Sequence, residues 1–172
     1  LNSPTERAIL LHGQRRIGKT SILLQLSQRL PKDQYMPILF DLMEKARLPI
    51  NQVIYELAQK IAVTLNLDDP LRGDFDDESF FLKTYLPKIR MSLKGLTLVF
   101  LFDEFDVLDA PTTEQLDVTA AAKSFFPYLR GWMAQADLER FVFVLGRKPD
   151  DMSMDFLATF KAARSHRVSV LL

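Results

Sequence analysis

The stretch that decides the fold of this chain is Gly13-Gln14-Arg15-Arg16-Ile17-Gly18-Lys19-Thr20. It matches the phosphate-loop pattern G-x-x-x-x-G-K-[ST] at every fixed position. An apolar run at residues 8–11 precedes it, and residues 21–30 follow it with apolar side chains at helical spacing. A loop between a strand and a helix presents successive backbone N–H groups, and the helix N-terminus adds partial positive charge. The stretch therefore predicts a phosphate-binding loop that opens a helix.

Each position in this loop has an expected role. Gly13 and Gly18 allow backbone angles and a close approach that a Cβ would block. Lys19 is expected to reach the β and γ phosphates of a nucleotide, and the Thr20 hydroxyl to contact Mg²⁺. The side chains of Arg15 and Arg16 are expected to point outward, toward a neighbouring domain or subunit. The remaining residues expected to line the phosphate site are Gln14, Ile17 and Ser21.

A second motif combines a buried strand with two acids. Residues 96–102 form a continuous apolar run, which is typical of a central strand covered on both faces, and Asp103-Glu104 follows directly. Crowding two carboxylates is costly unless a cation lies between them. We expect Asp103 to hold Mg²⁺ through water and Glu104 to orient and polarise the attacking water. An exposed loop acid remains the alternative at both positions.

Arg147 follows the strand predicted at residues 141–145. A strand beside the phosphate loop would aim its end at the γ-phosphate, and the planar guanidinium binds phosphate through two hydrogen bonds. Arg147 is therefore a candidate γ-phosphate sensor, with a solvated surface cation as the alternative. Asp41, which ends the strand predicted at residues 37–41, could also approach the site. Surface or capping positions are expected for Asp106 and Asp109.

The rest of the chain alternates short apolar runs with longer helical patterns, which predicts an α/β fold with a mostly parallel sheet. The acidic segment at residues 68–78 is interpreted as a solvated loop, because it lacks the spacing of a calcium loop. A capping box at Thr112 and Gln115 is expected to open one helix, with a break near Pro127. The predicted strands are residues 8–11, 37–41, 96–102, 141–145 and 168–172. The predicted helices are residues 21–30, 49–66, 79–94, 112–135 and 153–164.

Composition narrows the class of protein. A length of 172 residues fits one domain, and 22 basic residues balance 22 acidic ones, which argues against nucleic-acid binding through bulk positive charge. The chain contains no cysteine, so disulfides and thiolate metal sites are excluded and a reducing, cytoplasmic setting fits. It has no apolar run near the length of a membrane span and no signal-peptide pattern. Because it starts at Leu1 and ends on an apolar run, we expect a fragment of a longer protein.

Three segments together resemble a known family: residues 13–21, then Phe102-Asp103-Glu104-Phe105, then Leu145-Gly146-Arg147. They resemble the STAND branch of the AAA+-related P-loop ATPases, in particular its novel STAND and archaeal-ATPase-like members. The resemblance implies a three-layer P-loop NTPase sandwich with a parallel five-stranded sheet in the order 5-1-4-3-2. The resemblance spans the chain from Arg7 to Leu172, and residues 1–172 are predicted to form one ATPase core domain. The helical or winged-helix lid that follows the fifth strand in such proteins is absent from it.

The resemblance also implies roles and ligands. Lys19 and Thr20 match the Walker A residues, Asp103 and Glu104 match Walker B, and Arg147 matches the sensor position. ATP and Mg²⁺ are the implied ligands, bound and slowly hydrolysed as a conformational switch in a multidomain signalling or defence protein. The implied partners are other domains of the same chain and further copies that assemble on ATP binding, with no membrane contact.

Three other functions remain open. The first is the ATPase core of a DNA-acting machine, of the replication-initiator or transposition kind, although the neutral charge argues against direct nucleic-acid binding by this domain. The second is a nucleotide-binding scaffold without turnover, which would have no need of Glu104. The third is a small-molecule kinase, which would need an acceptor pocket and a substrate lid.

Overall fold

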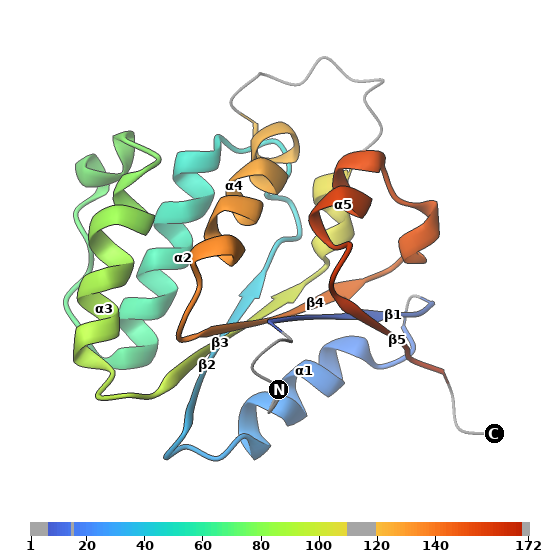
Figure 1. Ribbon diagram of the computed structural model, residues 1–172, viewed down its shortest axis with the longest axis horizontal. Coiled ribbons are helices and arrows are strands. Elements are labelled where there is room, and N and C mark those ends of the chain that lie inside the picture. The colour runs from blue at the N-terminus through green and yellow to red at the C-terminus, as the bar shows by residue number, and fades with distance from the viewer. Residues whose placement is uncertain (1–6, 15, 110–119, 170–172) are drawn as a thin grey trace.

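A parallel five-stranded sheet organises the chain, with the strand order β2-β3-β4-β1-β5. This computed structural model describes residues 7–14, 16–109 and 120–169 (Figure 1). The order is the predicted 5-1-4-3-2 read from the opposite edge, so the predicted fold class is confirmed. The strands are β1 (Ala8–His12), β2 (Tyr35–Asp41), β3 (Thr97–Asp103), β4 (Glu139–Leu145) and β5 (Arg164–Arg167).

The described helices cover the two faces of the sheet unequally, with α1 on one face and the others on the opposite face (Figure 1). The reason is topological. The connection from β1 to β2 runs along the sheet in one direction, and the connections from β2 to β3, β3 to β4 and β4 to β5 run in the other. Because crossovers between parallel strands are right-handed, α1 lies on one face and the later helices lie on the opposite face. The helices are α1 (Lys19–Arg29), α2 (Ile50–Leu65), α3 (Leu86–Ser92), α4 (Ala121–Gln135) and α5 (Met154–Thr159).

Stacked aromatic side chains, here called the aromatic platform, line the face of the sheet that α2 to α5 cover. Phe100 on β3 stacks on Phe141 of β4 at 5.7 Å between ring centroids, and Phe102 stacks on Phe143 at 5.4 Å. These pairs are in direct register, and the fully buried Trp132 of α4 packs edge-on against Phe100 at 4.7 Å. Aromatic pairs of this geometry add stability beyond the area that they bury. The platform therefore holds the central strands, and the loops at their ends, in one arrangement.

The fifth strand lies earlier in the chain than its apolar pattern predicts. β5 is Arg164–Arg167, and all four of its side chains are exposed. An edge strand needs only one hydrogen-bonded neighbour, and charged side chains protect such an edge from further pairing. The Val168 N–H still donates to the His12 carbonyl at 2.7 Å, so the ladder reaches the start of the predicted apolar run. The rest of that run, residues 170–172, lies outside the described residues.

The helix predicted at residues 79–94 is divided into a π-helical turn, Phe81–Tyr85, and α3, with Pro87 in the first turn of α3. A proline is tolerated there because the first N–H groups of a helix have no partner within it. Pro127, by contrast, lies inside α4 without ending it, so the predicted break is wrong. Thr112 and Gln115, the expected capping box, lie outside the described residues.

A buried ion pair ties α3 to the start of β4. Glu139 is fully buried, and its two carboxylate oxygens accept from Nε and NH2 of Arg90 at 2.6 and 3.0 Å. A bidentate guanidinium is the partner that compensates best for removing a carboxylate from water.

We therefore expect Arg90→Ala to lower the free energy of unfolding by about 3–5 kcal/mol, because it leaves the Glu139 carboxylate buried without its partner. Urea denaturation followed by circular dichroism measures this loss. The control is Lys88→Ala, which changes an exposed residue on the same helix and should cost no more than about 0.5 kcal/mol. A loss for Arg90→Ala as small as that of the control would contradict the prediction.

Candidate functional site

The phosphate loop connects β1 to α1 as predicted. Gly18 precedes the first residue of α1 and has φ +91°, a conformation that residues with a Cβ rarely adopt. Gly13 is required for a different reason, because a Cβ there would lie 2.6 Å from the carbonyl oxygen of Val168. The segment after β5 thus passes directly against the start of the loop. Arg15 lies outside the described residues.

Lys19 is buried inside the loop that it follows. Its side chain is only 6% exposed, and Nζ donates to the carbonyl oxygens of Gly13 at 3.0 Å and Gln14 at 2.7 Å. The Lys19 ammonium is therefore held against the backbone of the loop, close to any anion that the loop would enclose. The loop remains open to solvent elsewhere, since Gln14, Arg16, Thr20 and Ser21 are exposed and Ile17 and Gly18 are partly exposed.

Asp103 and Glu104 lie at the same edge of the sheet. Asp103 is the last residue of β3 and 6% exposed, and its Oδ1 accepts from the Glu104 N–H at 3.0 Å. Glu104 is partly exposed with φ +49°, the left-handed region that costs free energy for a residue with a Cβ. This conformation turns the chain sharply out of β3 at the residue expected to activate water. The same left-handed conformation occurs at Arg16, Glu44, Asn66 and Lys94, so it is a general feature of sharp turns in this chain.

Asp41 is the register partner of Asp103 on β2. Its Oδ1 accepts from the Met43 N–H at 2.8 Å, and the residue is exposed. The carboxylate is therefore engaged in the turn that follows its own strand, which is a local structural role.

Strand register brings the remaining candidates together. β4 pairs with both β1 and β3, and His12 is opposite Leu145 while Phe102 is opposite Phe143. All these strands are parallel, so the phosphate loop, Asp103-Glu104 and Gly146-Arg147 follow strand ends at one edge of the sheet. Ligands of open α/β sheets bind at this edge.

Arg147 contacts the turn that follows Glu104. Its NH2 group donates to the backbone carbonyls of Asp106 at 2.8 Å and Asp109 at 3.1 Å. Both carboxylates also lie 3.5 Å from the guanidinium. Asp106 and Asp109 are each 8% exposed, so of the two expected positions, surface or capping, the surface one is wrong. Their carboxylates instead accept from the backbone N–H groups of Gly146 and Ser153. No local sequence pattern marks these two aspartates, because the groups that they contact lie about forty residues downstream.

A pocket of about 290 Å³ lies between the phosphate loop and the ends of β4 and β5. Gly13 and Gln14 line it, and Arg147, Lys148 and Arg167 line it as well. Burial lowers the pKa of His12, another lining residue, and the positive charges of Arg167 and Lys148 lower it further, against an opposing effect of Asp150. The lowered pKa of His12 thus results mainly from burial, and the neighbouring Arg167 and Lys148 add positive charge that suits an anionic ligand.

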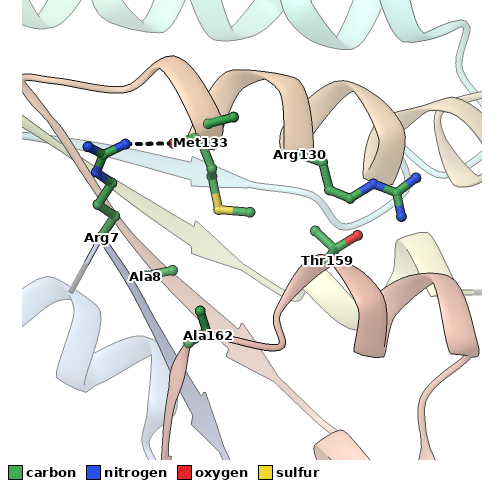
Figure 2. A pocket seen from close by; sticks show the side chains of 8 residues that line it. Arg7, Ala8, Arg130, Met133, Thr159 and Ala162 are labelled. Atoms are coloured by element: carbon green, nitrogen blue, oxygen red, sulfur yellow. Dashed lines mark hydrogen bonds between the residues drawn. The ribbon is translucent and has the colours of Figure 1, made fainter. Parts of the chain in front are cut away.

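A second pocket, of about 380 Å³, lies at the opposite edge of the sheet (Figure 2). Arg7 and Ala8, at the start of β1, line it together with Met133 of α4 and Thr159 of α5. Arg7 donates to the Met133 carbonyl at 3.2 Å, and small apolar side chains form much of the remaining wall. The length of β1 separates this pocket from the phosphate loop, so it is not part of the candidate site.

The residues available to a metal ion are few. Within the described ranges, no group of three or more His, Asp or Glu side chains could hold a metal. Thr20, in the first turn of α1, and Asp103 therefore fit only a Mg²⁺ ion that is completed by water and by phosphate oxygens of a ligand, as is usual for this ion. The described part of the chain also contains no helix long and apolar enough to cross a membrane.

Comparisons with known proteins identify the fold. No family model and no curated protein sequence matches the chain. Among solved structures, it is similar to the Aeropyrum pernix ORC2 protein in its ADPNP-ADP complexes, with a TM-score of 0.54 and 12% identity. It is also similar to a chain of the HORMA:CdnC:Trip13 complex of E. coli MS115-1, with a TM-score of 0.53 and 14% identity.

Each match covers 97% of this chain, but only 44% of the ORC2 chain and 49% of the other. This chain therefore spans less than half the length of both. Identities this low are evidence of fold alone. Together with the strand order, they identify an α/β fold with a parallel five-stranded sheet that this chain shares with the two matched structures.

Proposed function

We propose that this domain binds ATP with Mg²⁺ at the phosphate loop and hydrolyses it slowly, as a conformational switch within a larger signalling or defence protein. The observation that carries the proposal is the Lys19 ammonium, which is held inside the loop by the Gly13 and Gln14 carbonyls. It lies at the same edge of the sheet as Asp103-Glu104. The ORC2 structure was solved in ADPNP-ADP complexes, which supports an adenine nucleotide as the ligand.

Each residue of the site would have its own role in binding and hydrolysing the nucleotide. On binding, Lys19 would exchange its carbonyl contacts for oxygens of the β and γ phosphates, and the loop N–H groups would donate to the same phosphates. Thr20 and Asp103 would hold Mg²⁺, which when bound neutralises charge on the phosphates. The Glu104 carboxylate would orient a water molecule and accept its proton. Arg147 would contribute positive charge beside the γ-phosphate.

The alternative of a DNA-acting ATPase finds little support in this domain. The ORC2 likeness is one of fold, and the 22 basic and 22 acidic residues leave no net charge to attract a polyanion. A scaffold without turnover would have no need of the Glu104 carboxylate, which argues against that alternative. We place the switch in the cytoplasm, in keeping with the absence of cysteine, and propose other domains and further copies of the chain as its partners.

Lys19→Ala should weaken Mg-ATP binding about tenfold to a hundredfold or more, because a charge-assisted phosphate contact contributes about 1.5–3 kcal/mol. Calorimetric titration measures the affinity, and thermal unfolding checks that the variant remains folded. Lys32→Ala removes an exposed lysine beyond α1 and should bind like wild type. Equal affinities for Lys19→Ala and wild type would refute nucleotide binding at this loop.

Glu104→Gln should keep Mg-ATP affinity and slow single-turnover hydrolysis about a hundredfold or more, because the amide retains the shape of the carboxylate but cannot accept the proton. Rapid quench with radiolabelled ATP measures the rate. Glu78→Gln, in the exposed acidic segment, is the matched control. If both variants hydrolyse ATP at the wild-type rate, Glu104 has no part in the chemistry.

Arg147→Ala should weaken ATP binding about tenfold and leave ADP binding nearly unchanged, if the guanidinium contacts only the γ-phosphate. Both affinities are measured in one buffer, with Arg29→Ala, an exposed arginine at the end of α1, as the control. Equal losses for ATP and ADP would make Arg147 a general electrostatic contributor, and no loss for either would remove it from the site.

A further inference from the structure

Among the residues that the structure describes, the 3₁₀ turn Phe105–Asp109 holds Arg147 in place. Its NH2 group donates to two carbonyls of this turn, and its Nε lies 3.5 Å from Oδ2 of Asp106. An arginine side chain loses substantial rotamer freedom when it is ordered, and contacts that order it beforehand reduce that cost at the moment of binding. The turn therefore restricts the guanidinium to one position before any ligand arrives.

Asp106 and Asp109 are in turn fixed by backbone donors. Asp106 Oδ1 accepts from the Gly146 N–H at 2.8 Å, and Asp109 Oδ2 accepts from the Ser153 N–H at 3.0 Å. Burying two carboxylates against one guanidinium is costly, and these N–H groups compensate for part of that cost. Each carboxylate thus has one contact that anchors it and one contact to Arg147, in addition to the contact made by the carbonyl of the same residue.

Gly146 shows how closely the end of β4 approaches the turn Phe105–Asp109. A Cβ at this position would lie 3.2 Å from Oδ2 of Asp106, tighter than most side-chain contacts. The end of β4 is therefore packed directly on the Asp106 carboxylate, and the arginine that follows has little freedom to move away from it.

The position in which Arg147 is held is at the wall of the 290 Å³ pocket, which Gly13 and Gln14 of the phosphate loop also line. The contacts to the turn use NH2 and Nε, so the NH1 side of the planar fork can face a phosphate in that pocket. The same turn begins directly after Glu104.

We propose that Asp106 and Asp109 are positioning residues for nucleotide recognition: they hold the Arg147 guanidinium at the pocket shared with the phosphate loop, so that it distinguishes ATP from ADP. This inference rests on the proposed function, and it assigns the selectivity to a three-residue unit instead of to Arg147 alone.

The test is a double-mutant cycle on nucleotide affinity. Asp109→Asn keeps the size of the side chain and removes its charge, and it should weaken ATP binding about threefold to tenfold with ADP binding unchanged. In the Arg147→Ala background the same change should have no further effect, because Asp109 acts through the guanidinium. A merely structural role would weaken both nucleotides, or would add to the effect of Arg147→Ala, and either result overturns the proposal.

Further variants distinguish a loss of nucleotide recognition from a folding defect. Asp106→Asn and Arg147→Lys should each reproduce the ATP-selective loss, the latter because lysine keeps the charge but lacks the fork. Asp155→Asn, an exposed aspartate in the first turn of α5, should bind both nucleotides like wild type. If Asp109→Asn unfolds below the assay temperature, the cycle is run with Asp106→Asn, and an equal loss of ATP and ADP affinity there overturns the proposal.

A second measurement needs no nucleotide. The Arg147 Nε–Hε resonance, assigned by its loss in Arg147→Ala, should be dispersed and slow to exchange in the ligand-free protein, and should move toward the free-arginine position in Asp106→Asn, because Nε lies beside Oδ2 of Asp106. A free-arginine signal in wild type overturns the positioning role, whether or not ATP binds. Wild-type protein that shows the protected signal but binds no Mg-ATP refutes the proposed function, and the recognition role with it.

Discussion

The parallel pairing of β4 with β1 on one side and β3 on the other is the constraint on which the rest of this structure depends. Parallel strands end at the same edge of a sheet, so this pairing brings together three loops that are far apart in sequence. The stacked rings of Phe100, Phe141, Phe102 and Phe143 hold β3 and β4 in register along their length. The geometry of the candidate site is thus set by packing in the middle of the sheet.

Two cations of the candidate site, Lys19 and Arg147, are bound to backbone carbonyls in this structure. Lys19 donates to Gly13 and Gln14, and Arg147 donates to Asp106 and Asp109. A buried ammonium or guanidinium without acceptors would be unstable, and carbonyl oxygens supply them without adding a full negative charge. A phosphate can displace such contacts more readily than it could displace a carboxylate bound to the same cation. The Lys19 contacts fit this exchange, whereas Arg147 is additionally held by two carboxylates.

Sequence patterns anticipated most elements because these follow from local signals, whereas the sheet order was implied by the family resemblance. The phosphate loop, the acidic end of β3 and the cation after β4 each carry a pattern tied to a specific backbone environment. The misplaced fifth strand has a physical reason: β5 is an edge strand whose side chains are all exposed, so it needs no apolar pattern. Pro127 was expected to break α4, but the helix continues through it, with Phe125, Phe126 and Leu129 beside it buried in the core.

The roles of Asp106 and Asp109 could not be read from the chain, since their partners lie about forty residues downstream, at Gly146, Arg147 and Ser153. Asp41 shows the converse: it occupies a strand end beside Asp103, yet its carboxylate bonds to the neighbouring Met43 N–H. The sequence by itself determined which backbone loop can enclose a phosphate, because that depends on glycines and a lysine at fixed local spacing. Only the tertiary structure decided which distant side chains complete the site, because strand register and the packing of one turn on another set those contacts.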